Sequence, residues 1–467
     1  MTSSTGVEQF TTDGEDRIDA GTVQRLIARE ERLFAAANAT SRTRYDAARD
    51  VLAGGVVSSF QLQEPWPVYL NRGLGAAVWD VDGTRRLDFH NGFGAMLQGH
   101  AHPGITETIA RAAGAATHVG ATGEDAVAVA TALRQRWKLH SWRFATTGSE
   151  ATMDALRLAR AATGREVVVK MFGAYHGHHD AVLVSVGDDD GGADPLSLPS
   201  VPAGEGIPRD VCDLTAAVPF NDAETLDARL ETLAARGRAV ACVIVEPVFQ
   251  MGVLVPDPGY LAAVREVTRR HGTLLVFDEV KSGFAVGSAG FTGACGVEPD
   301  LVTVGKALGG GLPVAAVGAS QETMDLVATR RVYQVGTFNG NALAMAVARE
   351  NLERVLTPEA HERLGDLGSM LADRCRHALD RAGRAGHGAL VGGRGFVALT
   401  RVPARDHTHV GQAHPPDVSR LAWLYLMNRG VFATPARPLQ WMVGLGHTAD
   451  DIVAYGSVFE ELVSELG

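Results

Sequence analysis

The chain lacks a cysteine framework, a long basic cluster and any apolar run that could cross a membrane. Its four cysteines are scattered without CxxC spacing, which predicts neither disulfides nor a zinc site. A net charge of −11 without a Lys/Arg block makes nucleic acid and anionic membranes poor candidates as partners. A membrane-spanning helix needs about 20 consecutive apolar residues. The first 16 residues are polar, so we expect no secretory signal and a cytoplasmic protein with reduced thiols.

The length and composition indicate a soluble enzyme with more than one lobe. At 467 residues the chain is too long for one simple core, while 46% apolar and 21% charged residues are ordinary values. Residues 1–20 are rich in Ser, Thr, Gly and Asp, and we expect them to be disordered. We then predict an N-terminal segment of the small lobe at 21–90, a large domain at 91–341 and a C-terminal small domain at 342–467.

Apolar runs alternate with helical patterns from about residue 125 onward. Short runs of β-branched and aliphatic residues are typical of buried strands, and the alternation is typical of βα units. The fold class predicted is α/β, with a mostly parallel sheet flanked by helices and a smaller α/β lobe built from both termini. The predicted strands of the sheet are 167–171, 241–245, 274–277, 301–304 and 314–318, and the predicted helices are 222–236, 258–271 and 342–356.

The N-terminal part has its own pattern. A helical pattern over residues 23–52 stops at Gly54-Gly55. Short apolar segments at 69–70, 76–83 and 87–89 predict antiparallel strands. Asp82-Gly83 is a hairpin-turn signal between two of them.

Two predicted strands lead to residues of complementary chemistry. The strand at 274–277 is followed by Asp278, and the strand at 301–304 leads to Lys306 and a glycine tract. A carboxylate and an amine at the ends of neighbouring buried strands are the pair that pyridoxal phosphate (PLP) requires. The lysine carries the cofactor as a Schiff base, and the acid keeps the pyridine nitrogen protonated. For two such segments alone, a solvated lysine and a turn-capping aspartate are the ordinary alternatives.

A third segment suits a phosphate. Residues 146–151 (Thr-Thr-Gly-Ser-Glu-Ala) precede a helical pattern at 152–162. Gly148 would let the backbone approach an anion at the helix N-terminus, and Ser149 adds a hydroxyl. An ordinary N-cap at Ser149 is the alternative for this segment.

An aromatic and three histidines follow the strand at 167–171. Tyr175 is placed to stack on a planar heterocycle. His176, His178 and His179 give no strong metal-ligand set, and no carboxylate cluster faces them. We therefore predict no metal site.

Taken together, the motifs resemble those of class III aminotransferases, and most closely the glutamate-1-semialdehyde aminomutases and their relatives. The resemblance runs from about Tyr45 to the C-terminal end. It implies a fold type I PLP enzyme, usually a homodimer with its active site at the subunit interface. The matching motifs, in family order, are WDVDG (79–83), GHAHP (99–103), TGSEA (147–151), AYHGHHD (174–180), FDEVKSGF (277–284), GKALGGGLP (305–313) and GTFNGN (336–341).

The resemblance implies a function for each matching residue. Lys306 is implied to be the Schiff-base lysine and the proton shuttle, and Asp278 the partner of the pyridinium nitrogen. Val280 would pack on the ring face opposite Tyr175.

The family also implies how the phosphate is held. Gly148 and Ser149 would bind it within one subunit, and Thr337 would reach the phosphate of the partner subunit.

The chain departs from the aminomutase pattern where the substrate binds. Gln61 stands near the position of an arginine that holds the substrate carboxylate, and a neutral amide does not replace a guanidinium. The family's gating glutamate falls near Leu439, with Arg437 two residues away. We take Gln61, Phe93 and Arg437 as the candidate substrate residues.

Two further departures lie closer to the cofactor. The chain lacks the asparagine that in relatives bonds the cofactor 3′-oxygen, and we expect Gln250 to take its place. Lys281 occupies a position where many relatives have Gln or Met, and it could tune the charge of the ring or point to the surface.

The function expected is that of a PLP-dependent aminotransferase, which moves an amino group between a small amine or amino acid and a carbonyl acceptor. A PLP-dependent aminomutase or epimerase is the alternative, since it needs the same residues. A scaffold without activity is disfavoured because Lys306, Asp278, Tyr175 and Thr337 are all retained. An oxidoreductase would need a GxGxxG after the first strand, and none occurs there.

Overall fold

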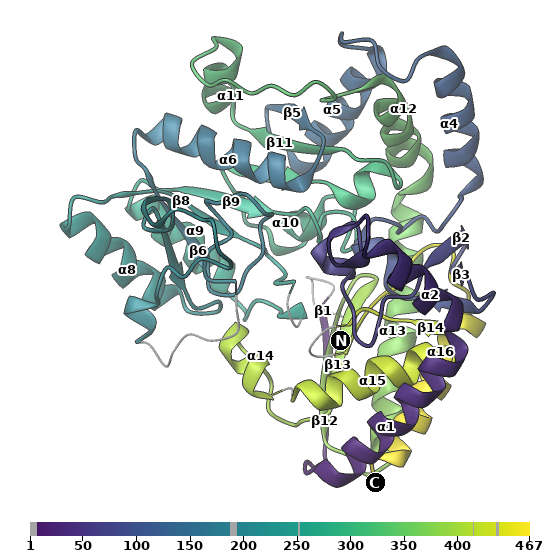
Figure 1. Cartoon of the computed structure of the whole chain (residues 1–467). Helices are drawn as coiled ribbons and strands as arrows, with labels where there is room; N and C mark the ends of the chain where they lie inside the picture. Colours follow the sequence, from purple (N-terminus) through teal and green to yellow (C-terminus); the bar gives the residue numbers. More distant parts are fainter. Residues whose placement is uncertain (1–6, 187–193, 251–252, 414, 436–438) are drawn as a thin grey trace.

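The structure is a computed structural model that describes residues 7–186, 194–250, 253–413, 415–435 and 439–467. Figure 1 shows a large domain at the top and a smaller lobe at the lower right. The first helix of the chain lies in the smaller lobe, beside helices from the C-terminal part. Both ends of the chain therefore contribute to this lobe, as predicted.

A seven-stranded sheet forms the centre of the large domain. In sheet order its strands are β5 (Ser141–Ala145), β11 (Ala315–Ala319), β10 (Leu301–Val304), β9 (Leu274–Asp278), β8 (Val240–Val245), β6 (Val167–Met171) and β7 (Thr215–Val218). All pairs from β10 to β7 are parallel, whereas β11 runs antiparallel to both of its neighbours. The predicted α/β fold with a mostly parallel sheet is confirmed.

Helices cover both faces of this sheet, which explains why its strands are apolar throughout. Val276 packs with residues of α6 on one face, and the adjacent Leu275 packs with residues of α8 and α9 on the other. The helices of the large domain are α4 (Pro103–Ala115), α5 (Glu124–Trp137), α6 (Gly148–Thr163), α7 (Arg209–Cys212), α8 (Ala223–Ala235), α9 (Tyr260–Arg270), α10 (Gly290–Cys295), α11 (Gln321–Ala328) and α12 (Ala342–Glu350).

The smaller lobe contains two four-stranded sheets. One is antiparallel and has the order β1 (Val7–Thr12), β12 (Gly386–Val391), β13 (Arg394–Ala398), β15 (Leu439–Met442). The other has the order β14 (Val431–Phe432), β4 (Arg85–Asp88), β3 (Ala77–Asp80), β2 (Leu70–Leu74). The helices are α1 (Ala20–Ala37), α2 (Ala39–Ala48), α3 (Asn91–Gly94), α13 (Pro358–Arg381), α14 (His407–Ala413), α15 (Pro416–Asn428) and α16 (Ala449–Glu465).

The prediction of a disordered segment at 1–20 is wrong for the part that the structure describes. Residues 7–12 form β1, which pairs along its whole length with β12. Thr12 is buried and its hydroxyl donates a hydrogen bond to the carbonyl of Arg384. Pairing with the C-terminal lobe overrides the polar composition of this segment. The division of the chain at residues 21, 91 and 342 remains a prediction.

The helix expected at 23–52 is broken into α1 and α2 at Asn38. The side chain of Asn38 donates to the carbonyl of Phe34, and its own oxygen accepts from Arg86. Its backbone carbonyl accepts from the Trp66 indole. These buried contacts hold Asn38 outside helical geometry, and a polar residue of this kind favours such local alternatives to a helix.

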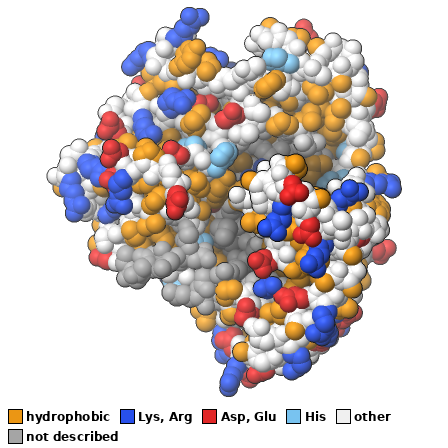
Figure 2. Space-filling view, in the orientation of Figure 1, with side chains coloured by type: hydrophobic (Ala, Val, Ile, Leu, Met, Phe, Trp, Pro, Cys, Tyr) orange, Lys and Arg blue, Asp and Glu red, His pale blue; other side chains and the backbone are white. Residues whose placement is uncertain are grey.

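The surface mixes charges over the smaller lobe and exposes apolar side chains elsewhere. Figure 2 shows acidic and basic side chains interspersed on this face of the smaller lobe. Hydrophobic side chains gather at the upper right, where Figure 1 places α4, α5 and α12. Val119, Val127 and Phe338 are each more than half exposed. Within the described part of the chain, no helix has the length and apolar character needed to cross a membrane.

Candidate active site

The ends of β9 and β10 bring the predicted carboxylate and amine together. Asp278 is the last residue of β9, and it lies opposite Thr303 of the parallel strand β10. Lys306 follows β10 by two residues and begins a single helical turn, Lys306–Gly309. Its φ of 47° is left-handed, a backbone geometry that L residues adopt only under tertiary constraint. The Asn351 side chain holds this turn through hydrogen bonds to the carbonyls of Ala307 and Leu308, at 2.6 and 3.1 Å.

Three donors surround the buried carboxylate of Asp278. His176 Nδ1 lies 2.8 Å from its Oδ2, while the Thr303 hydroxyl and the Val280 N–H donate to its Oδ1 at 3.0 and 3.1 Å. Burial would raise the pKa of Asp278, but the His176 contact and the Val280 N–H lower it below the usual value. The carboxylate thus stays ionised in a buried place, as a pyridinium partner must.

Lys306 is buried in the same cavity and has a lowered pKa. Burial is the main cause, with Arg394 acting in the same direction, while Asp278 and Glu246 partly oppose it. A lowered pKa increases the fraction of neutral amine at a given pH, and the neutral amine is the nucleophile that a carbonyl group requires.

The N-terminus of α6 is shaped for an anion. Its N-cap is Thr147, which forms a capping box with Glu150, so the alternative of Ser149 as an ordinary cap does not hold. A side chain at Gly148 would place its Cβ 2.7 Å from Val280 Cγ1, so only glycine permits this close approach. The Ser149 hydroxyl lies beside His178, whose N–H donates to it at 3.2 Å.

A cavity of about 220 Å³ collects most of the predicted cofactor residues. Its lining includes Gly148, Ser149, Tyr175, His176, Glu246, Gln250, Asp278, Val280, Lys281 and Lys306. The cavity offers an amine, an ionised carboxylate and a helix N-terminus freed of side chain by Gly148. These groups fit the aldehyde, the ring nitrogen and the phosphate of PLP respectively.

A larger cavity of about 440 Å³ adjoins the first, and it is mainly apolar. Phe60 lines both cavities, and its ring lies 5.4 Å from Tyr175 and 5.6 Å from Phe93 between centroids. Gln61 and Phe93 also line the larger cavity. No arginine or lysine lines this cavity among the residues that the structure describes. We call it the substrate entrance.

A left-handed turn forms one wall of the entrance. The four residues of α3 have φ values of 48°, 55°, 59° and 89° from Asn91 to Gly94. Buried contacts fix this turn: the Asn91 N–H donates to Asp88, and its amide donates to the carbonyl of Met442 at 2.5 Å. This turn follows β4 and places Phe93 in the wall of the entrance.

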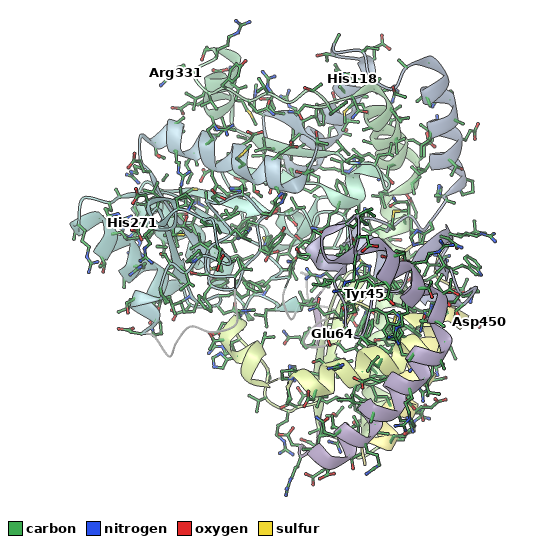
Figure 3. All side chains as sticks on the ribbon, in the orientation of Figure 1. Tyr45, Glu64, His118, His271, Arg331 and Asp450 are labelled. Carbon is green, nitrogen blue, oxygen red and sulfur yellow. The ribbon has the colours of Figure 1, made fainter. Side chains whose placement is uncertain are left out.

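Two predicted residues do not join these cavities. Thr337 lies in a separate pocket with His118, Arg143 and Asn339; Figure 3 places His118 at the top of the molecule. Within one chain Thr337 thus does not share a cavity with Ser149. Arg437 lies outside the described residues.

The sequence interpretation did not assign partners to several buried groups. His176 was considered only as a metal ligand, although it contacts Asp278, the cofactor carboxylate candidate. Glu246 and Arg394 are buried near Lys306 and influence its pKa. The sequence did offer a signal that His176 belongs to the site. It directly follows Tyr175, in a motif already placed at the end of the predicted strand 167–171.

The three histidines of this motif have separate partners. His176 contacts Asp278, His178 contacts Ser149 and His179 lies 3.3 Å from the Thr152 hydroxyl. One group in the described part of the chain, formed by Asp227, Glu231 and His271, has the geometry to hold a metal. Figure 3 places His271 on the far left of the large domain, near α8 and α9.

Comparisons with known proteins agree with this geometry. The family described as Aminotransferase class-III matches residues 60–394. A glutamate-1-semialdehyde 2,1-aminomutase from Symbiobacterium thermophilum is 38% identical over 407 residues, which cover 86% of this chain and 91% of that protein. The fold predicted from the sequence, that of fold type I PLP enzymes, is confirmed by two solved structures.

An omega-transaminase from Sphaerobacter thermophilus superposes with a TM-score of 0.85 at 32% identity, covering 91% of this chain and 97% of that one. A glutamate-1-semialdehyde aminomutase from Pseudomonas aeruginosa PAO1, solved in complex with PMP, gives 0.88 at 29% identity, covering 96% and 100%.

Proposed function

The chain belongs to the class III aminotransferase family, whose cofactor is PLP, and we propose that it transfers an amino group between a small amine or amino acid and a carbonyl acceptor. The observation that carries this choice is the composition of the substrate entrance. Its described lining is mainly aromatic and aliphatic, and its polar side chains are Gln61, Gln63, Asp88, His90, His100 and the Tyr69 hydroxyl, with no guanidinium among them. Such an entrance suits amines with an apolar substituent.

The residues of the cofactor cavity divide the chemistry between them. PLP, when bound, supplies the electron sink that allows the C–H bond beside the amine to break. Lys306 would hold the cofactor covalently, and its amine would move the proton of that carbon. Asp278 would keep a proton on the ring nitrogen of the bound cofactor, because its buried carboxylate stays ionised beside His176. These two residues are the proposed catalytic pair.

Other residues position the cofactor. Gly148, Ser149 and the N-terminus of α6 would bind the phosphate, and Tyr175 and Val280 would enclose the ring. Gln250 lines the same cavity and would bond the 3′-oxygen. Each of these assignments is supported by the shared cavity lining.

An aminomutase is a second candidate, and the curated relatives favour it. The Symbiobacterium protein bears that name at 38% identity, and the Pseudomonas structure bears it with nearly complete coverage. The omega-transaminase structure supports the aminotransferase instead. Both reactions use the same proposed catalytic pair, so the fate of the carbonyl product distinguishes them.

The experiment uses PLP-loaded enzyme and a panel of amines without an acceptor. An aminotransferase releases the carbonyl product and leaves the cofactor carrying the amino group, with a loss of the visible absorbance of the bound cofactor. An aminomutase instead returns an isomer of the substrate and releases no free carbonyl. Efficient isomerisation of glutamate-1-semialdehyde would overturn the aminotransferase proposal.

We also propose that the enzyme is a homodimer. The exposed Val119, Val127 and Phe338 offer an apolar surface near the pocket of Thr337. A second chain on this surface would let Thr337 reach the partner subunit's phosphate site. Sedimentation of wild type and Phe338→Asp tests this association. We further propose a cytoplasmic location, supported by four free cysteines.

A further inference from the structure

The cofactor cavity contains a second lysine that the proposed chemistry does not use. Lys281 lines this cavity together with Lys306. Its Cγ lies 4.0 Å from where a Cβ on Gly94 would stand, so it also borders the left-handed turn of the substrate entrance. Lys281 therefore lies in the cofactor cavity, beside the turn that carries Phe93.

The amine of Lys281 has no hydrogen-bond or ion-pair partner among the residues that the structure describes. The nearby carboxylates have other partners: Asp278 is bonded by three donors, and Glu246 accepts a hydrogen bond from the Gln250 N–H. Burial also raises the pKa of Glu246, which favours its neutral form. The nearby guanidinium of Arg394 donates to the carbonyls of Val248, Phe249 and Gln250.

The electrostatic surroundings make this position unfavourable for a cation without a ligand. Burial is the main reason that the pKa of Lys281 lies well below its usual value, and Arg394 and Lys306 lower it further. Glu246 opposes this effect. An anionic oxygen arriving in the cavity would restore the charged form and gain a charge-assisted hydrogen bond.

Lysine is rare in this chain, which argues against Lys281 being an ordinary surface residue. The sequence contains only four lysines, whereas arginine supplies nearly all other basic side chains. Lys170 is buried and donates to three backbone carbonyls, and Lys138 ends α5. The other two lysines share the cofactor cavity.

We propose that Lys281 is a specificity-determining residue that binds an anionic oxygen in the cofactor cavity, in the first place a carboxylate oxygen of the amino substrate. This rests on the proposed function and names its substrate class: amines that carry an apolar group and a carboxylate. The carboxylate would be held inside the cofactor cavity, which compensates for the amide of Gln61 in the entrance. The ring oxygen of PLP offers the same chemistry, and the test separates these two sources.

The first arm measures binding without turnover. PLP-loaded wild type, Lys281→Met and Lys281→Gln are titrated calorimetrically with 3-phenylpropionate and with its neutral counterpart 3-phenylpropionamide. We expect both variants to bind the carboxylate at least about tenfold more weakly and the amide within about twofold of wild type. Lys138→Gln, which removes a lysine outside the cavities, is the matched control and should leave both affinities unchanged.

The second arm follows the cofactor. If the ring oxygen is the occupant, Lys281→Met shifts the absorbance maximum of bound PLP and leaves 3-phenylpropionate affinity unchanged. An unchanged spectrum with unchanged carboxylate affinity in both variants, each with wild-type circular dichroism, would overturn the proposal. Failure of the proposed function is separate, because it would appear as wild-type enzyme that binds 3-phenylpropionate but transfers no amino group from any amine.

Discussion

The cofactor cavity and the substrate entrance are built in different ways. Strand ends and a helix N-terminus of the large domain supply the cofactor cavity, and hydrogen bonds fix its Asp278. Loops and a left-handed turn of the smaller lobe supply much of the entrance, where the ring of Phe60 packs between those of Phe93 and Tyr175. A buried sheet thus holds the reacting groups, while substrate choice lies with segments that can change without disturbing the sheet.

The largest effect is expected from Lys306→Ala, which removes the covalent attachment at the centre of the cofactor cavity. The variant should fold, bind PLP noncovalently and show no detectable turnover. Borohydride reduction followed by peptide mass mapping checks the attachment. A reduced cofactor bond at Lys281 in this variant would mean that the two lysines can exchange functions.

A smaller but still large loss is expected from Asp278→Asn. The neutral amide no longer holds a proton on the ring nitrogen, so the rate should fall by more than two orders of magnitude, roughly 3–4 kcal/mol. Steady-state kinetics with saturating PLP measures this loss. Near-normal turnover would show that another group keeps the ring nitrogen protonated.

His176→Phe tests how firmly the cofactor cavity depends on its buried contacts. We expect a loss of roughly 10- to 100-fold, typical of a partner that orients a reacting group. His176 is the first of the contacts that lower the Asp278 pKa, against the effect of burial. Without this contact the pKa of Asp278 rises. As the pH falls, the carboxylate of the variant is therefore protonated at a higher pH than that of wild type.

The acidic limb of the pH–rate profile should therefore move to higher pH in His176→Phe. A profile parallel to that of wild type at all pH values would contradict this reasoning. His178→Phe is the control, because that histidine contacts Ser149 and not Asp278.

The smallest effect is expected in the entrance, from Gln61→Arg. Because Gln61 is exposed, a new ion pair there is screened and should favour carboxylated over uncarboxylated amines by about fivefold or less. The ratio of kcat/KM for a matched pair of amines measures this change. A much larger change would mean that the entrance closes over the substrate and excludes water.

The sequence predicted the sheet and its cofactor residues well because both depend on local patterns. The strands at 167–171 and 301–304 were predicted with their observed bounds, since buried parallel strands are continuous apolar runs. The antiparallel direction of β11 was not predicted, although the short connection after Lys306 leaves no room for the crossover helix that a parallel strand requires.

The entrance was the least predictable part of the site. Gln61 and Phe93 were found by resemblance, whereas Phe60 acquires its contacts with Tyr175 and Phe93 only in the folded chain. Likewise, the pairing of His176 with Asp278 joins residues 102 positions apart. Contacts between distant segments leave no periodic signal in the sequence.

The left-handed turn at residues 91–94 also has a consequence for the conformational stability of the smaller lobe. Phe93 has a bulky side chain and a positive φ value, which destabilises the folded state by about 1–2 kcal/mol relative to glycine. Selection of variants by thermal tolerance alone would therefore favour Phe93→Gly, a change that also deletes an aromatic wall of the entrance. At this position, a search for heat resistance and a search for substrate discrimination would lead to opposite residues.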